Sequence, residues 1–209
     1  MRILKKLSAV LASYPEFSSK IEWKKKDENV FCANPQYGSI SHGVICKESG
    51  EPIYDLPVVE FIESAIVIPY NLDERGRISK IVIIQSERPV SGLKLWEFPG
   101  GFLDENESPE KAVLRELVEE TGLIGRNLLF LGKVVPEKVT YKKAGVHIFA
   151  LEITSSTKEI KTDIRESKVI ASKYLSVSEY EDLLTKEKNH CGITLASWAL
   201  FRAYFRSKL

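Results

Sequence analysis

The chain has 209 residues, 44% of them hydrophobic, which is enough for one full domain and a small appendage. Its 30 basic and 29 acidic residues leave a formal net charge of +1. Because nucleic-acid-binding proteins carry a strongly basic surface, this balance argues against a nucleic-acid partner. The sequence also has no run of about 20 apolar residues, the length that a membrane span needs, so we expect no membrane partner.

The cysteines Cys32, Cys46 and Cys191 are widely spaced and fit no CxxC metal-ligand pattern. Since three cysteines cannot all pair within one chain, we expect reduced thiols and a cytoplasmic protein. At the amino terminus, a short surface helix is predicted to end near Pro15.

Residues 1–57 are expected to form a small antiparallel strand domain. Its predicted strands are short and are separated by turn-forming residues; they span 23–26, 39–47 and 53–56. This segment has too little apolar content for a core of its own. We therefore expect it to pack on the main domain or on a second subunit, and we predict a homodimer that uses it.

The main domain is expected to span residues 58–209. Its hydrophobic runs predict strands at 64–70, 80–85, 128–135, 145–153 and 169–175. Helices are predicted at 109–121, 178–186 and 193–207. Strands on both sides of a central helix imply an α/β fold in which helices sandwich a mixed sheet.

The central helix has clear end signals. Ser108 can cap it, Pro109 suits its first position, and Gly122 can end it. A helical wheel places four apolar residues on one side, namely Val113, Leu114, Leu117 and Val118. The same wheel is expected to place three carboxylates on the opposite side, namely Glu116, Glu119 and Glu120.

Three carboxylates on one stripe repel one another unless a cation lies among them. A solvated acidic face is one interpretation, and Arg115 can offset part of the charge. A divalent cation with oxygen ligands would offset the rest, and Mg²⁺ is the natural choice where phosphate is present, with Mn²⁺ as the alternative. The glycines at 100 and 101 let the backbone approach a ligand or offer a carbonyl to a metal, and Glu107 is placed to reach Arg115.

The joint spacing of Gly101, Glu107 and residues 115–123 (RELVEETGL) resembles the Nudix box at every defined position. The preceding residues 96–100 (WEFPG) are similar to the usual lead-in. The resemblance implies a Nudix-type α/β/α sandwich. It also implies a metal-dependent hydrolase that cleaves nucleoside diphosphates linked to another group.

The resemblance also implies roles for individual residues. Glu116, Glu120 and the Gly100 carbonyl would be metal ligands, and Glu119 a further ligand or a group that positions water. Arg115 and Glu107 would hold the helix and its carboxylates in place, while the Gly101 backbone would approach the substrate.

The general base would come from an acidic loop at residues 154–167. This loop contains Glu159, Asp163 and Glu166. A rough alignment favours Glu166, although a solvated loop carboxylate is the alternative for each of them.

Three features resemble the branch that cleaves ADP-ribose and nucleotide sugars. They are the small N-terminal strand domain, the Gln85–Arg88 segment, and residues 192–196 (GITLA) at the start of the last helix. In that branch, the strand domain swaps across a dimer. Arg88 would contact a phosphate. Lys138 stands where the ADP-ribose enzymes have a proline, which favours other nucleoside diphosphate sugars over ADP-ribose itself.

The predicted reaction is hydrolysis of ADP-ribose or a nucleoside diphosphate sugar to a nucleoside monophosphate and a sugar phosphate. Two alternatives remain open. One is a house-cleaning nucleoside triphosphate pyrophosphatase, against which the N-terminal appendage counts. The other is a non-catalytic Nudix-like binding module, against which the intact box counts.

Overall fold

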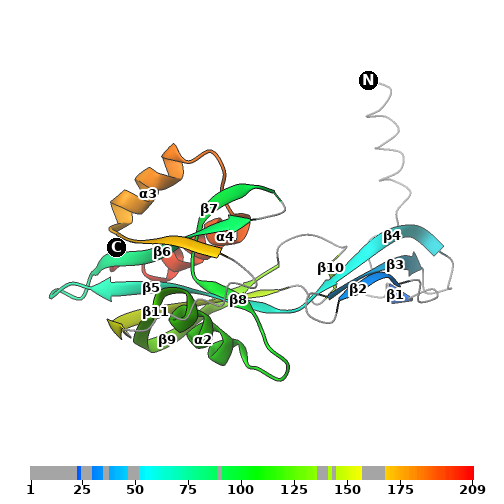
Figure 1. The fold of residues 1–209 in the computed structure, drawn as a ribbon, viewed down its shortest axis with the longest axis horizontal. Coiled ribbons are helices and arrows are strands. Elements are labelled where there is room, and N and C mark those ends of the chain that lie inside the picture. The colour runs from blue at the N-terminus through cyan, green and yellow to red at the C-terminus, as the bar shows by residue number, and fades with distance from the viewer. Residues whose placement is uncertain are drawn as a thin grey trace. The chain divides into compact units, whose positions relative to one another are not determined.

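The computed structural model describes residues 23–24, 30–34, 38–46, 52–88, 91–135, 141–142, 145–156 and 168–209. The helix expected to end near Pro15 lies outside these ranges, and so does the loop over residues 157–167. The chain separates into two compact units, of which the first comprises Met1–Phe61 and Val139–Lys142, and the second Ile62–Lys138 and Lys143–Leu209 (Figure 1). The predicted domain boundary between residues 57 and 58 falls within a strand, and it stays a prediction.

The first unit holds a five-stranded sheet in the order β1-β3-β4-β10, with β2 also paired to β3. Its strands are β1 (Trp23–Lys24), β2 (Val30–Asn34), β3 (Gly38–Cys46), β4 (Pro52–Phe61) and β10 (Tyr141–Lys142). The pairings of β1, β2 and β4 with β3 are antiparallel, as expected. Strand β10 was not predicted, and it pairs with β4 in parallel.

The second unit holds a mixed seven-stranded sheet in the order β12-β6-β5-β11-β9. Its strands are β5 (Ser64–Leu72), β6 (Ile78–Arg88), β7 (Leu93–Glu97), β8 (Gly100–Phe102), β9 (Leu123–Val134), β11 (Val146–Ser156) and β12 (Lys168–Leu175). The pairing of β5 with β11 is parallel, and the others are antiparallel. Strand β7 pairs with β6, and β8 pairs with the first residues of β5.

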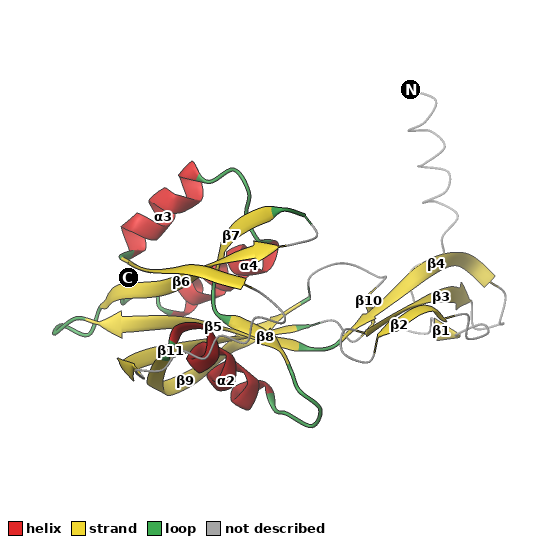
Figure 2. Ribbon diagram, viewed as in Figure 1, coloured by secondary structure: helices red, strands yellow, loops and turns green. Residues whose placement is uncertain are grey.

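Three helices of the second unit cover this sheet (Figure 2). They are α2 (Pro109–Thr121), α3 (Val177–Lys186) and α4 (Gly192–Tyr204). Among the described residues, no helix is both long and apolar enough to cross a membrane.

Alternate residues of the central strands enter two separate hydrophobic cores. In β5, Ala65 and Val67 pack with α2, whereas Ile68 and Tyr70 pack with α3 and α4. In the same way, Val82 of β6 packs with α2, whereas Ile81 and Ile83 on either side of it pack with α3 and α4. Successive side chains of a strand point to opposite faces, so the sheet lies between two helical layers. This arrangement is the sandwiched mixed sheet that the hydrophobic pattern predicted.

Candidate active site on helix α2

Helix α2 begins and ends where its sequence signals predicted. The Ser108 side chain accepts a hydrogen bond from the Lys111 N–H, and Pro109 occupies the first turn. At the other end, Gly122 adopts a left-handed φ of 68° and its N–H donates to the Val118 carbonyl. The ends of the helix are therefore set by residues next to each other in the chain.

The predicted faces of α2 need correction. Its buried residues are Ala112, Val113 and Leu117, whereas Leu114 is 40% exposed. At about 100° per residue, a residue three positions after another lies about 60° from it, and one seven positions after lies about 20° from it. Glu116 and Glu120 are three and seven positions after Val113. They therefore lie beside the buried face and not opposite it.

Both carboxylates reach the Gly100–Gly101 backbone of β8. The Gly100 N–H donates to Glu120 Oε2 at 2.9 Å. A Cβ atom added at Gly101 would lie 2.3 Å from Glu116 Oε1, so only a residue without a side chain fits against this carboxylate. The sequence thus places two acidic side chains of the helix against a backbone that can approach them closely.

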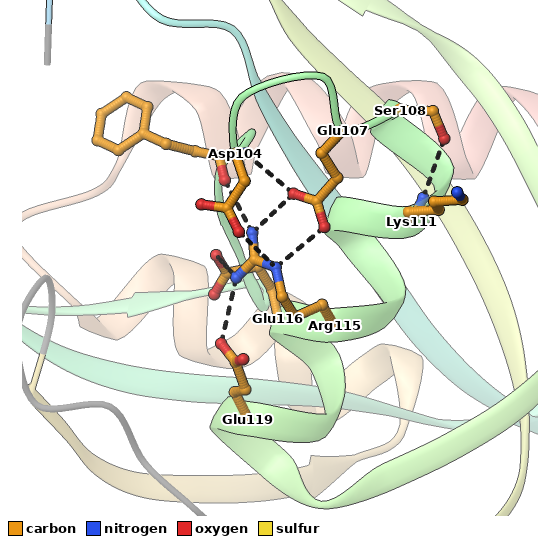
Figure 3. A network of polar contacts seen from close by, with 8 residues as sticks. Asp104, Glu107, Ser108, Lys111, Arg115, Glu116 and Glu119 are labelled. Carbon is orange, nitrogen blue, oxygen red and sulfur yellow. Dashed lines mark hydrogen bonds and ion pairs between the residues drawn. The ribbon is translucent and has the colours of Figure 1, made fainter. Parts of the chain in front are cut away.

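Arg115 is the centre of the polar network around these carboxylates (Figure 3). Its Nε and Nη2 atoms donate to the two oxygens of Glu107, both at 3.0 Å, which is the bidentate geometry that suits a guanidinium. Its Nη1 donates to Glu116 Oε1 at 2.8 Å and to Glu119 Oε2 at 3.2 Å. The Phe102 carbonyl accepts a further hydrogen bond from Nη2. The guanidinium therefore joins the helix to the loop before it and to β8.

The charges of this network stabilise one another. The hydrogen bonds from Arg115 lower the pKa of the Glu107 carboxyl below its ordinary value, against the opposing effect of burial. Conversely, the hydrogen bond to Glu107 raises the pKa of the Arg115 guanidinium, with Glu116 adding to the effect. Because both groups are ionised at neutral pH, the clamp between Glu107 and Arg115 is present under physiological conditions.

A pocket of about 200 Å³ lies beside the carboxylates of α2. Its wall includes Gly100, Gly101 and Glu120, and also residues at the start of α4. Apolar side chains complete the wall, namely Ile66, Ile84 and Val146 of the central strands and Phe98 between β7 and β8. The pocket is therefore large enough for part of a small molecule, and it connects the acidic face of α2 to an apolar interior.

Arg88 also lines this pocket, from the end of β6. Its Nη2 donates to Glu97 Oε2 at 2.5 Å, across the β6–β7 pairing. Glu97 is 4% exposed, whereas the Arg88 side chain is about half exposed. A buried carboxylate therefore holds the Arg88 guanidinium beside the pocket.

Sequence reasoning missed several residues of this pocket. Glu97 lies within the recognised WEFPG lead-in, but its burial and its pairing with Arg88 depend on the register of β6 against β7. Cys191 and Thr194, at the start of α4, line the pocket from more than 70 positions beyond Glu120 in the chain. No sequence signal assigned these two residues to the site.

The predicted metal ligands offer carboxylate and carbonyl oxygens, which is the donor type that Mg²⁺ prefers. Glu116 and Glu120 both approach the Gly100–Gly101 backbone, so these residues fit such an ion. Within the described residues, however, no group of three acidic, histidine or cysteine side chains is arranged so that it could hold a metal ion. Glu119 instead contacts Arg115.

The predicted general bases Glu159, Asp163 and Glu166 lie outside the described residues, as does Lys138. At the start of the same predicted loop, Thr154 is described, and its hydroxyl donates to the Ile124 carbonyl.

Comparison with known proteins gives one family match. A model of the NUDIX domain matches residues 62–194, which is more than half of the chain. A solved structure described as an ADP compounds hydrolase is similar over 92% of this chain and 98% of its own, with a TM-score of 0.70 and 14% identity. At this identity the likeness shows the fold, and it confirms the expected α/β/α sandwich.

Relatives named for an enzymatic activity match over short segments. An ADP-sugar pyrophosphatase of Mus musculus is 49% identical over 45 residues, which are 22% of this chain and 21% of that protein. An RNA pyrophosphohydrolase of Bartonella bacilliformis is 32% identical over 79 residues, or 38% and 46% of the two chains. An 8-oxo-dGTP diphosphatase of Proteus vulgaris is 68% identical over 40 residues, or 18% and 36%. This chain thus spans less than half the length of each relative.

Proposed function

Because the chain belongs to the NUDIX domain family, we propose that it is a metal-dependent pyrophosphatase of ADP-ribose or another nucleoside diphosphate sugar. The products would be a nucleoside monophosphate and a sugar phosphate. One observation carries the proposal. Glu120 and the Gly100–Gly101 backbone, which Glu116 also approaches, line a pocket that Arg88 lines as well. An acidic side chain for a cation and a basic side chain for a phosphate thus border one cavity.

In this proposal, Glu116, Glu120 and the Gly100 carbonyl hold Mg²⁺ or Mn²⁺, with Glu119 as a further ligand or a group that positions water. When bound, the ion would screen the charge of the pyrophosphate and make the attacking water more acidic. Arg115 and Glu107 act on the reaction indirectly, since their bidentate pair keeps α2 and its carboxylates in position.

Arg88 is the proposed phosphate contact. A guanidinium carries five N–H donors in a planar fork, so it can hold Glu97 and a phosphate oxygen at the same time. The Arg88–Glu97 pair would fix the guanidinium before substrate arrives, which lowers the entropy lost on binding. The backbone at Gly101, which also lines the pocket, would face the same substrate.

The proposal includes the cellular compartment and the redox state of the cysteines. We infer a cytoplasmic enzyme with reduced thiols from the small number and wide spacing of the cysteines. The described Cys191 is a free cysteine.

A substrate panel tests the proposed activity. We expect turnover of one or more of ADP-ribose, ADP-glucose, GDP-mannose and UDP-glucose with Mg²⁺ or Mn²⁺, and none with EDTA. Three other substrate types are compared with these sugars: dinucleoside polyphosphates, dNTPs including 8-oxo-dGTP, and 5′-triphosphorylated RNA. The last two are included because relatives are named as an 8-oxo-dGTP diphosphatase and an RNA pyrophosphohydrolase. If the enzyme hydrolysed these substrates faster than the diphosphate sugars, the proposed substrate class would be wrong and the triphosphate pyrophosphatase would replace it.

The variant Glu120→Gln tests the proposed metal site. It keeps an oxygen that can accept the Gly100 N–H but removes the charge, so we expect less than a tenth of the wild-type rate at saturating Mg²⁺ with an intact fold. Mg²⁺ should raise the melting temperature of the wild type and not that of Glu120→Gln. The control is Glu110→Gln, at an exposed position in the first turn of the same helix. A Glu120→Gln rate above a tenth would contradict the ligand assignment.

A further inference from the structure

The start of α4 lines part of the pocket described above. Cys191, Ile193 and Thr194 contribute to its wall, to which Glu120 also contributes. Cys191 is the N-cap residue of this 13-residue helix, and its side chain makes no capping hydrogen bond. The first N–H groups of a helix have no partner within the helix, so this end presents donors and a partial positive charge.

Thr194 provides a second and independent observation at the same place. Its side chain is 2% exposed, and its Oγ1 has no hydrogen-bond partner among the residues that the structure describes. A threonine inside a helix commonly bonds the carbonyl three or four positions before it. Thr194 is the third residue of α4, and its hydroxyl makes no such hydrogen bond in the described structure.

The next buried hydroxyl of α4 behaves differently. Ser197 is fully buried, and its Oγ donates to the Ile193 carbonyl at 2.8 Å. Ser197 thus satisfies its hydroxyl within the helix, whereas Thr194 does not, although both lie on the same element. A buried hydroxyl without a partner destabilises a protein, and it persists where a bound molecule supplies the partner.

The pocket next to Thr194 favours an uncharged ring over a second phosphate. Its wall is largely apolar, and Arg88, its basic side chain, is already the proposed contact of the pyrophosphate. Sugar rings combine apolar faces with hydroxyl groups that both donate and accept hydrogen bonds. A hydroxyl oxygen can therefore accept from the N–H groups at the helix start while it exchanges a hydrogen bond with Thr194.

We propose that Thr194 and the start of α4 form a specificity subsite that binds one hydroxyl of the substrate's sugar. This inference rests on the proposed function, because it assumes that the pyrophosphate lies against α2. With the pyrophosphate at Glu120, the group attached to it extends along the pocket toward α4. Rotation about the Cα–Cβ bond of Thr194 moves its buried hydroxyl between staggered positions, so that it can meet a ligand in the pocket that this residue lines.

The first test compares Thr194→Val, which has nearly the same shape without a hydroxyl, with Thr194→Ser, which keeps the hydroxyl. Each is assayed with the best substrate of the panel and with its analogues that lack single sugar hydroxyls. We expect Thr194→Val to lose about 10- to 100-fold in kcat/KM, mainly through KM, and Thr194→Ser to stay within a few-fold of wild type. For one deoxy analogue, wild type and Thr194→Val should have similar kcat/KM.

The second test measures stability and binding without turnover. Thr194→Val should raise the melting temperature of the ligand-free protein by about 2 °C or more, because it removes an unsatisfied buried hydroxyl. It should also weaken binding of ADP-ribose with a methylene bridge in place of the bridging oxygen, measured by calorimetry. If the Thr194 hydroxyl has a purely structural role, Thr194→Val should instead lower the melting temperature and leave binding of the analogue unchanged.

Ser197→Ala is the matched control on the same helix, and we expect it to lower stability while leaving the discrimination between sugars unchanged. The subsite proposal is overturned if Thr194→Val keeps wild-type kcat/KM and the wild-type preference for the complete sugar. If wild type hydrolyses none of the diphosphate sugars, the proposed function fails first. The two failures are therefore distinguishable.

Discussion

Glu116 and Glu120 lie beside the buried face of α2, where water screens their charges less than on an open surface. The side chain of Glu116 is 12% exposed, and Arg115 offsets its charge at 2.8 Å. A single guanidinium also serves Glu107 and Glu119, so it cannot fully neutralise the carboxylates around it. At the scale of single residues, the remaining negative charge is the feature that favours a divalent cation.

A water molecule that attacks phosphorus must still give up a proton, and carboxylates that hold a cation accept it poorly. We predict that Glu166→Gln lowers kcat about 10²- to 10⁴-fold with little change in KM, the size expected for loss of a general base. Asp163→Asn and Glu159→Gln should have much smaller effects. Kinetics of the three variants at fixed pH and metal decide the matter. An inactive Asp163→Asn beside an active Glu166→Gln would show that the alignment register is wrong, and three active variants would place the base elsewhere.

At the scale of elements, β8 determines how α2 meets the sheet, and its two glycines serve different purposes. Gly100 has a φ of 155°, and a Cβ there would lie 2.2 Å from the Ala65 carbonyl oxygen of β5. At Gly101, the atom in the way is a carboxylate oxygen of Glu116, at the end of a flexible side chain. Gly100 is therefore required by the pairing of β8 with β5, and Gly101 by the position of the Glu116 carboxylate.

This difference predicts separable effects. Gly100→Ala should destabilise the protein by about 2–4 kcal/mol or prevent its folding, because backbone must move. Gly101→Ala should keep a melting temperature within a few degrees of wild type, yet lose about 10- to 100-fold in kcat, since it displaces Glu116. Thermal unfolding and kinetics of both variants provide the comparison. Equal melting temperatures for the two, or full activity of Gly101→Ala, would show that β8 does not position the carboxylate.

The pairing of β9 with β11 carries an ion pair remote from the pocket. Arg126 Nη2 donates to Glu152 Oε1 at 2.6 Å, and Asn127 Nδ2 donates to Oε2 at 3.0 Å. These hydrogen bonds lower the pKa of the Glu152 carboxyl below its ordinary 4.5, and the one from Arg126 has the largest effect. A lowered pKa in the folded state means that the ionised group stabilises the fold above its ordinary pKa. That contribution is lost as pH falls through the lowered value.

We therefore predict that Glu152→Gln is less stable than wild type at pH 7 and that the difference disappears as pH falls below 4.5 and through the lowered pKa of Glu152. Urea unfolding across this range measures it, with Glu105→Gln, at an exposed loop position, as the control. A difference that stays constant with pH would mean that packing, and not charge, is lost in the variant.

At the scale of the whole molecule, the first unit joins strands from two distant parts of the chain, since β10 pairs with β4. We predict a homodimer whose interface uses residues before Val58, because this segment has little apolar content for a core of its own. Sedimentation velocity at tens of micromolar should show the dimer. Amide hydrogen exchange in β3 and β4 should slow as the protein concentration rises. A monomer throughout this range would rule out the prediction.

The sequence alone determined the features that depend on residues close together in the chain. The limits of α2 follow from Ser108, Pro109 and Gly122, and the contact between Glu107 and Arg115 follows from their spacing across the first turns of the helix. The hydrophobic runs located the central strands because buried strands are continuously apolar. Likewise, the spacing of the box identified the family, which the domain match confirmed.

Tertiary structure decided which groups meet. The sheet determines which side of α2 is buried, so Leu114 is exposed and Glu116 faces β8. The register of β6 against β7 brings Arg88 to Glu97, and the packing of α4 brings Thr194 to the pocket. These contacts join residues far apart in the chain or on different elements. They depend on strand register and helix packing, which local propensity does not encode, because both result from burying many side chains at once.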